Sequence, residues 1–372
     1  MRFPEFGGEW EEHTLSEYLE FKNGLNPDAK RIGSGLPFIS VMDILSEGVI
    51  NYDNIRGKVD ATDKEIECFG VKDGDLLFQR SSETLEDVGR ANVYMDNRIA
   101  IYGGFVIRGR KIGNYDPLFF KYLLATPLAR NRTRRMGAGA QHFNIGQEGL
   151  SKISLYFPSI EEQRKTAGFL SLIDERIATQ NKIIEKLESL IKGIAQHCIK
   201  ESISGITYVK LGDICQITTG KLDANAQVDN GIYPFFTCAE KPFKIDNFAF
   251  DTEALLISGN GANLGYINYY KGKFNAYQRT YVLDLFSENI QYIKWALKVL
   301  LPKRIAIEKS LSNTPYIVLS TLTDLRLPLP CKSEQSFIAN LMQSLERILS
   351  NQIAQYDSYN YLKQYLLRQM FI

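Results

Sequence analysis

Two stretches of the chain concentrate positive charge beside polar loops. Pro117 to Gln147 contains no acidic residue, and the second stretch has only Glu308 against its basic residues. Lysine and arginine at this density suit phosphate binding, and amide or imidazole side chains nearby can hydrogen-bond base edges. The first stretch carries Lys121, Arg130, Arg132, Arg134 and Arg135 before Gln141 and His142; the second carries Lys294, Lys298, Lys303, Arg304 and Lys309 before Asn313. A solvated basic surface is the alternative for each.

A second group of candidates follows short β-type runs in each half of the chain. Arginine can pair bidentately with guanine, and asparagine or glutamine with adenine, so these residue types suit base recognition. The same types are common in ordinary loops. The candidates are Arg80, Ser81, Ser82 and Arg90 in the first half and Lys221, Asn260, Asn263, Tyr277, Gln278 and Arg279 in the second.

Catalytic motifs are weak. Asn313-Thr-Pro-Tyr316 is one residue away from Asn-Pro-Pro-Tyr, with which adenine-N6 methyltransferases hold the target amino group, but the first half has no equivalent. The glycine-rich run from Gly259 to Gly265 is followed by no helical pattern or ribose-binding acid. The cysteines and histidines lack the spacing of zinc ligands. We therefore expect no catalytic residue, cofactor or metal in this chain.

The elements that would position the candidates occur twice. Leu155 to Ile194 and Leu327 to Leu366 each read as an apolar strand ending in proline, a Glu-Gln pair and a long helical pattern. Shorter matches extend the repeat: Gly24 with Gly220, Ile39 with Phe236 and Phe78 with Ile257. The repeat predicts two equivalent modules, each closed by a long helix. We expect domains at 1–157 and 204–329 and long helices at 158–203 and 330–372.

Both long helical patterns contain a heptad seam, which predicts a coiled coil. The first seam is Ile173, Ile177, Gln180, Ile184, Leu187, Ile191 and Ile194; the second is Leu345, Leu349, Gln352, Tyr356, Tyr359, Lys363 and Leu366. If the helices pack antiparallel about a pseudo-twofold axis, Gln180 and Gln352 lie close together and set the register; alternatively, each faces solvent. Such rods would hold two modules at a fixed distance, which suits a ligand with its own repeat, such as duplex DNA at about 34 Å per turn.

Bulk properties fit a globular protein with two domains. The 372 residues are 44% hydrophobic and 23% charged, and the net charge of +1 decides nothing about partners. The polar, acidic N-terminus is not a signal peptide, and no apolar run has the length of a membrane helix. We therefore expect an α+β protein in the cytoplasm, with no membrane association.

Together these features resemble the specificity subunits of type I restriction–modification systems. The resemblance rests on Arg2-Phe-Pro-Glu-Phe6 with Trp10, on Gly74 to Ser82, on Pro158 to Gln163 before the long helix, and on Leu367 to Ile372. It covers essentially the whole chain, and the duplicated order makes it specific.

The resemblance implies a non-catalytic DNA-recognition subunit. Each domain would be a target recognition domain for half of a bipartite double-stranded site. The antiparallel helices would space the domains and dock two methyltransferase subunits, and motor–nuclease subunits would join the assembled complex. Two departures are expected to weaken partner contacts: the second helix is more polar, and little sequence precedes Arg2.

Two other functions stay open from the residues alone. A self-contained adenine-N6 methyltransferase would use the loop Asn313 to Tyr316 and would bind S-adenosylmethionine by itself. The other is a coiled-coil interaction scaffold that does not bind DNA; loss of DNA affinity on neutralising Arg134 and Arg135 would argue against it.

Overall fold

The chain forms two compact units, and each unit includes a part of each long helix. The computed structural model describes residues 1–139, 142–200, 207–312 and 316–371, with only the backbone for 309–312. The first unit comprises Met1–Asn181 and Gln355–Ile372, and the second comprises Lys182–Ala354. Each unit is described by itself below.

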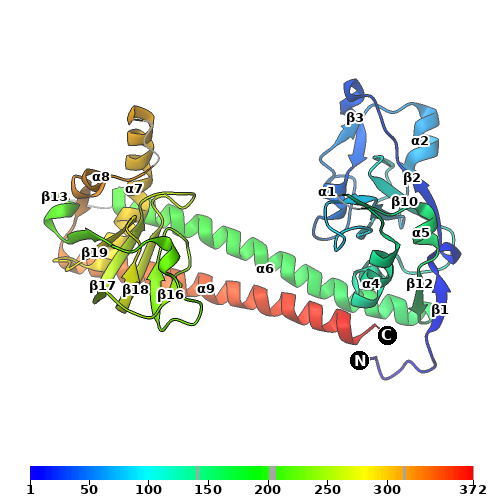
Figure 1. Cartoon of the computed structure of the whole chain (residues 1–372). Coiled ribbons are helices and arrows are strands. Elements are labelled where there is room, and N and C mark those ends of the chain that lie inside the picture. Colours follow the sequence, from blue (N-terminus) through cyan, green and yellow to red (C-terminus); the bar gives the residue numbers. More distant parts are fainter. Residues whose placement is uncertain (140–141, 201–206, 313–315, 372) are drawn as a thin grey trace. The chain divides into compact units, whose positions relative to one another are not determined.

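The two long helices are α6 (Ile160–Lys200) and α9 (Lys332–Gln369) (Figure 1). In the first unit, Ile173 and Ile177 from early α6 share a core with Leu366 from late α9. In the second unit, Ile191 from late α6 shares a core with Ile338 from early α9. The two helices therefore run antiparallel, as the resemblance implied.

The glutamine pair of the seam is divided between the units. Gln180 belongs to the first unit, where it is 6% exposed. Gln352 is half-buried in the second unit. The burial of Gln180 differs from the solvent-facing alternative, and the proximity of the two side chains stays a prediction.

The first unit is built on two small sheets and a strand pair. The strand pair joins β1 (Glu11–Thr14) to β12 (Ser154–Phe157). One sheet has the order β2 (Leu19–Asn23), β10 (Val106–Lys111), β6 (Leu76–Gln79) and β8 (Ala91–Val93). The other has the order β4 (Lys58–Val59), β3 (Ile32–Ile39), β9 (Ala100–Tyr102) and β5 (Gly70–Val71).

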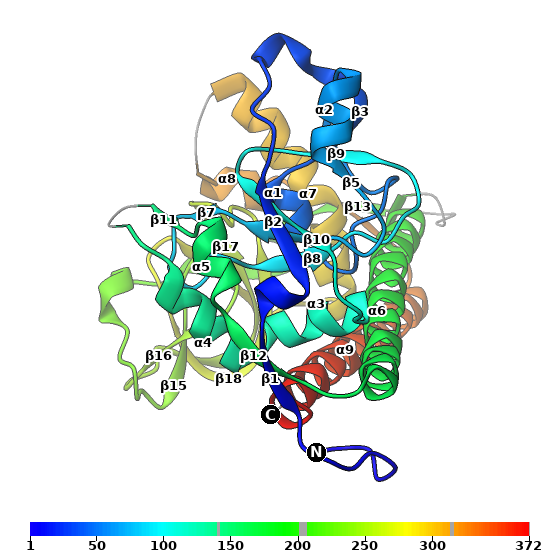
Figure 2. The ribbon, with the colours of Figure 1, turned by 90° about the vertical axis from the view of Figure 1, so that its right-hand side faces the viewer.

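Short helices complete the first unit. They are α1 (Val41–Ile44), α2 (Asp63–Phe69), α3 (Pro117–Ala125), α4 (Pro127–Met136) and α5 (Gln147–Ser151), and a further pair of strands joins β7 (Ser81–Ser82) to β11 (Phe143–Asn144) (Figure 2). Both faces of the central strand β6 are covered. Leu76 and Phe78 enter the core against α3 and α6, whereas Leu77 enters a second core with Tyr94 and Tyr102. This alternation explains why β6 reads as a continuous apolar run.

The second unit repeats this plan with fewer interruptions. Its strand pair joins β13 (Thr207–Lys210) to β20 (Arg326–Leu329). Its sheet has the order β14 (Gln216–Thr219), β19 (Thr280–Asp284), β17 (Phe250–Ser258), β18 (Ile267–Ala276), β15 (Tyr233–Phe236) and β16 (Phe243–Ile245). The helices α7 (Ile290–Ser312) and α8 (Leu319–Thr323) follow in the same chain order as α3 to α5.

Strand registers establish the equivalence residue by residue. In the first unit Val106 pairs with Gln79 and Tyr102 with Ile39; in the second unit Thr280 pairs with Ser258 and Ala276 with Phe236. The registers agree with the sequence matches of Phe78 with Ile257 and of Ile39 with Phe236. The internal repeat predicted from the sequence is therefore confirmed.

A buried glutamine fixes the start of each long helix. Gln163 is 3% exposed; its Oε1 accepts from the backbone N–H of Asp116 at 3.1 Å, and its Nε2 donates to the carbonyl of Pro158 at 3.0 Å. Gln335 binds the N–H of Asn289 and the carbonyl of Pro330 at the same distances. We call each of these glutamines, with its two hydrogen bonds, a glutamine lock. It ties the start of a long helix to the residue before an earlier helix of the same unit, α3 in the first unit and α7 in the second.

A glycine in each unit allows two backbone segments to touch. A Cβ added at Gly220 would lie 1.9 Å from the carbonyl oxygen of Ala276, and one added at Gly24 would lie 2.1 Å from that of Gly103. Gly220→Ala is expected to lower the free energy of unfolding by roughly 1–3 kcal/mol, because the sheet must open to admit the methyl group. Urea unfolding followed by circular dichroism measures this.

The control for this prediction is Gly193→Ala on an exposed turn of α6, where an added Cβ meets nothing within 4 Å. It should stabilise the protein by about 0.5–1 kcal/mol, since alanine favours the helix. Equal midpoints for Gly220→Ala and the unaltered protein would contradict the explanation.

Candidate nucleic-acid interface

In each unit, candidate DNA-contacting residues lie where two paired strands end, β6 with β10 in the first unit and β17 with β19 in the second. In the first unit, the N–H of Arg80 donates to the carbonyl of Phe105 at 2.8 Å, and the N–H of Ile145 donates to the carbonyl of Arg80 at 3.0 Å. In the second unit, Gly259 bonds to Arg279 and Ile317 to Gly259, both at 2.8 Å. Position 80 is therefore equivalent to 259, and position 105 to 279. We call these places the first and second strand-end sites.

The two strand-end sites share a backbone but differ in chemistry. The first has an arginine at position 80 and an exposed phenylalanine at position 105. The second has a glycine at position 259 and an exposed arginine at position 279. An arginine therefore occurs once at each site, on opposite strands of the pair.

The first strand-end site gathers three of the predicted residues. The guanidinium of Arg80 donates to the carbonyl of Gly104 at 3.3 Å. Ser81 pairs across β7–β11 with Asn144, and its hydroxyl donates to the Asn144 side chain. Ser82 is 9% exposed, so it lies below the surface. His142 is exposed beside this strand pair, and Gln141 lies outside the described residues.

The second strand-end site also brings predicted residues together. Gln278 and Arg279 line a polar cavity of about 300 Å³ with Gly259, Tyr281 and Ile317. The Arg279 guanidinium lies 5.7 Å from the ring centre of Tyr316. Asn260 and Asn263 lie beside it, since the Asn260 Oδ1 accepts from the Cys238 thiol and the Asn263 amide donates to the Cys238 carbonyl.

The other predicted residues of the second unit lie apart from this cavity's lining. Tyr277 is half-buried and donates its backbone N–H to Phe236, whereas Lys221 and Lys303 are exposed. Arg304 pairs with Glu308 at 2.7 Å. Asn313 lies outside the described residues, so only Tyr316 of the methyltransferase-like loop is described.

Basic side chains line a cavity in the first unit, which we call the cationic pocket. It measures about 470 Å³ and is lined by Arg90, Arg130, Arg134 and Lys363, with Glu86 as the one acidic lining residue. Arg90 and Arg134 were predicted from the sequence. Arg130 belonged to the basic run and Lys363 to the helix seam, and neither was among the selected DNA contacts.

The arginines of the cationic pocket differ in how firmly they are held. Arg130 donates from Nη2 to the carbonyls of Glu86 and Val88 at 2.7 and 2.8 Å, while its buried Nη1 has no partner among the described residues. Burial, with the neighbouring charge of Arg90, lowers the pKa of Arg130 to about 10. Arg90 and Arg134 each pair with one surface carboxylate, Asp87 and Glu86. Arg130 therefore stays charged at neutral pH, and an anion in the pocket would reduce its repulsion with the neighbouring arginines.

Other basic residues of the two stretches are occupied within the fold. Arg132 donates to Glu12 at 2.8 Å and to the Ser154 hydroxyl at 2.9 Å, which ties α4 to the β1–β12 pair. By contrast, the side chain of Arg135 is exposed and makes no hydrogen bond or ion pair in the described part of the chain. Lys294 and Lys298 both contact Glu346 of α9, at 2.8 and 3.0 Å. Charge density alone did not separate anchoring residues from structural ones.

Within the described residues, no group of three or more His, Cys, Asp or Glu side chains is placed to hold a metal ion. None of the described helices is long and apolar enough to cross a membrane.

Comparison with known proteins agrees with the duplicated geometry. The family described as "Type I restriction modification DNA specificity domain" matches residues 7–189 and 203–356, which is once in each half. The chain belongs to this family. The resemblance predicted from the sequence is thus confirmed.

Individual relatives differ in how much of the chain they match. The Type I restriction enzyme EcoDI specificity subunit of Escherichia coli is 44% identical over 137 residues, covering 37% of this chain and 30% of that protein. The chain thus spans less than a third of that relative in this match. The Type I restriction enzyme MjaVIII specificity subunit of Methanocaldococcus jannaschii is 23% identical, covering 94% of this chain and 88% of that protein.

A solved structure shares the fold over its whole length. The type I restriction–modification S subunit from M. genitalium superposes with a TM-score of 0.66 at 17% identity, covering 100% of this chain and 99% of that one. The expected α+β fold, with two similar domains and antiparallel long helices, is therefore confirmed for this member of the family.

Sequence reasoning missed two features of the first unit. Phe105 lies in a β-rich run, Gly104-Phe-Val-Ile107, and was not selected as a candidate contact, yet its side chain is 68% exposed. Lys363 reaches the cationic pocket from a helix more than two hundred residues away in sequence. The repeated Glu-Gln pair was visible, but its role as a lock follows only from the contacts of Gln163 and Gln335.

Proposed function

We propose that the chain is the DNA-recognition subunit of a type I restriction–modification complex. Each unit reads one half of a bipartite double-stranded site, and α6 with α9 sets the spacing between the halves. The chain itself carries no catalysis and acts in the cytoplasm, where its DNA is located. The target recognition domains correspond to residues 1–157 and 204–329, and the spacer helices to 158–203 and 330–372.

One observation carries this proposal: the same strand-end site occurs twice with different side chains. Equivalent backbone positions hold Arg80 and Phe105 in one unit and Gly259 and Arg279 in the other. A fold that needed these positions for packing would keep similar residues at both. Exposed residues that vary on a fixed frame are typical of recognition, since the frame sets geometry and the side chains select the ligand.

Binding affinity would come from phosphate contacts near each strand-end site. In the first unit the cationic pocket supplies Arg90, Arg130 and Arg134 for this role. Phosphate contacts orient the duplex without reading it, while the strand-end residues meet base edges in the major groove. The predicted contacts at His142, Lys221, Asn260, Asn263, Lys303 and Arg304 remain part of this proposal, as do Ser81, Ser82, Arg132, Arg135, Tyr277 and Gln278.

The partners follow from the family. Two methyltransferase subunits would dock on the long helices and carry out adenine methylation, and motor–nuclease subunits would join the assembled complex. The contact between Gln180 and Gln352 would set the register of the helices on which they dock.

A binding selection tests the proposed function. The chain is co-expressed with a type I methyltransferase subunit, and bound duplexes are selected from a random pool and sequenced. We expect two short defined blocks around a fixed gap. One continuous motif would contradict two recognition domains held apart by the long helices. Absence of any enriched DNA motif would favour an interaction scaffold that does not bind DNA.

A further inference from the structure

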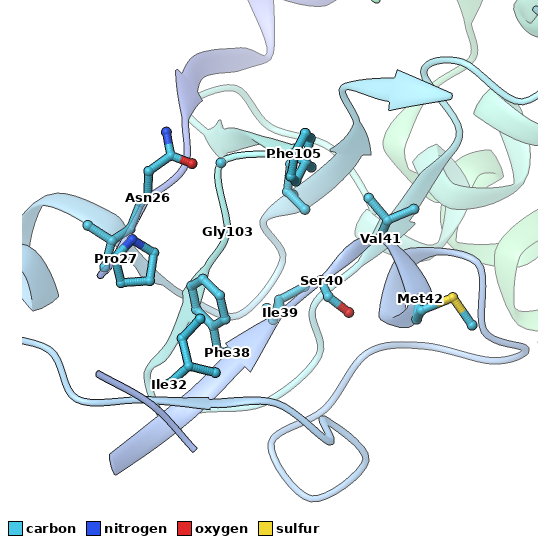
Figure 3. A pocket seen from close by; sticks show the side chains of 13 residues that line it. Asn26, Pro27, Ile32, Phe38, Ile39, Ser40, Val41, Met42, Gly103 and Phe105 are labelled. Carbon is cyan, nitrogen blue, oxygen red and sulfur yellow. The ribbon is translucent and has the colours of Figure 1, made fainter. Parts of the chain in front are cut away.

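An apolar pocket opens at the first strand-end site. It measures about 420 Å³, and its polar lining is limited to Asn26 and Ser40 apart from backbone groups. Figure 3 shows Phe105 and Val41 on one side of the space and Phe38 and Ile32 on the other. Phe105 is 68% exposed and Ile32 55% exposed, so the pocket is open to a ligand from outside.

Polar side chains meet the rim of the pocket at Gly104. The carbonyl of Gly104 accepts from Arg80. The amide of Asn26 lies against the α-carbon of Gly104, where an added Cβ would be 1.8 Å from the Asn26 Oδ1. The Asn26 side chain is exposed and makes no hydrogen bond in the described part of the chain. An amide, a guanidinium and an apolar surface therefore converge at one backbone position.

Packing does not require the apolar side chain at this position. The equivalent position in the second unit is Arg279, which keeps the same backbone hydrogen bond at 2.8 Å. The cavity beside Arg279 is polar, with Gln278 and Tyr281 in its lining. The fold therefore accepts a charged, solvated side chain where the first unit exposes a phenylalanine.

We propose that the apolar pocket receives the 5-methyl groups of thymines and makes the first unit select A·T pairs. This inference rests on the proposed function. The thymine methyl is the apolar group that the major groove displays, and asparagine pairs bidentately with adenine, so Phe105 and Asn26 suit the two halves of an A·T pair. A cavity of about 420 Å³ exceeds one methyl group and has room for those of neighbouring thymines. Arg279 at the equivalent position directs the second unit towards G·C pairs.

Deoxyuridine substitution tests the inference, because it removes the methyl group and preserves base pairing. Once the selected motif is known, each thymine in both half-sites is replaced singly and binding of the complex is measured by fluorescence anisotropy. We expect about a fourfold loss of affinity for at least one position in one half-site, which is the value of one buried methyl-sized group. Phe105→Ala should bind the thymine duplex more weakly and should no longer distinguish it from the deoxyuridine duplex.

Two further variants separate recognition from folding. Phe105→Arg copies the second unit and should shift the selected bases in that half-site from A·T to G·C, which an unfolded domain could not do. Ile112→Ala removes an apolar side chain that is 59% exposed outside the pocket lining, and it should retain the full thymine preference.

The possible failures are distinguishable. A split motif with no deoxyuridine effect, or with an unchanged effect in Phe105→Ala, would overturn the inference and leave the proposed function intact. Loss of the methyltransferase from purified Phe105→Ala complexes, with unchanged base preferences, would make the pocket a protein interface and overturn it too. Absence of any split motif would instead refute the proposed function.

Discussion

Replacing Arg90 and Arg134 together by glutamine should weaken DNA binding of the assembled complex roughly tenfold or more, for target and unrelated duplexes alike. Both side chains line the cationic pocket, and among the described residues each forms an ion pair with one surface carboxylate. Surface ion pairs are weak, so a phosphate can displace them at low cost. Because phosphate contacts release counterions, the slope of log affinity against log salt should flatten by about two, one for each lost contact.

Fluorescence anisotropy over a series of KCl concentrations measures both effects. The matched control is Lys152→Gln, which removes one positive charge from a side chain that is 63% exposed and paired with Glu148 outside the pocket. It should alter the affinity and slope little. A loss of affinity confined to the target sequence would mean that these arginines contact bases. An equal loss of affinity in the control would mean that net charge, and not the pocket, determines binding.

Breaking one glutamine lock should weaken recognition of one DNA half-site and leave recognition of the other half-site unchanged. In Gln163→Met the side chain keeps about the same volume, but the N–H of Asp116 and the carbonyl of Pro158 lose their partners. A buried or half-buried backbone group without a partner costs about 1–3 kcal/mol, so with two such groups the first unit should lose roughly 2–6 kcal/mol of stability. Gln335→Met should have the same consequence for the second unit through Asn289 and Pro330.

The measurement is the binding selection repeated with each variant, together with urea unfolding. We expect Gln163→Met to weaken the base preferences in one block of the split motif and Gln335→Met to weaken those in the other block. Gln355→Ala, which changes an exposed glutamine on α9, should leave both blocks intact. If both variants weakened the base preferences of the same block, or if neither changed the urea unfolding midpoint, the glutamines would not hold their own units to the helices.

The architecture was predictable because its signals are local or repeated. The heptad seams at Ile173 and Leu345 depend on side-chain spacing along one helix, and a repeat is recognised by comparing the chain with itself. The match of Gly24 with Gly220 proved right because a backbone segment lies against each glycine, and that of Ile39 with Phe236 because both side chains are buried in equivalent strand pairs. At such positions the local structure allows few residue types, so the residue type indicates the local structure.

The function of individual charges was not predictable in the same way. Arg130, Arg132 and Arg134 lie within five residues of each other on α4, yet one is half-buried against backbone carbonyls, one joins α4 to a strand pair and one pairs with Glu86 at the surface. The direction of each side chain around the helix and the segments packed beside it decide among these roles. Neither is contained in the local sequence.

The sequence by itself therefore determined the order of elements, the duplication and the family, because periodicity and repetition need no knowledge of contacts between distant segments. Only the tertiary structure decided which residues meet. It brings Lys363 to Arg90 and Arg134, and Asn26 to Gly104 and Arg80. It also leaves the side chain of Phe105 exposed within the β-rich run Gly104 to Ile107. The reason is physical: a binding site depends on the register between strands and on helix packing, which join residues far apart in the chain.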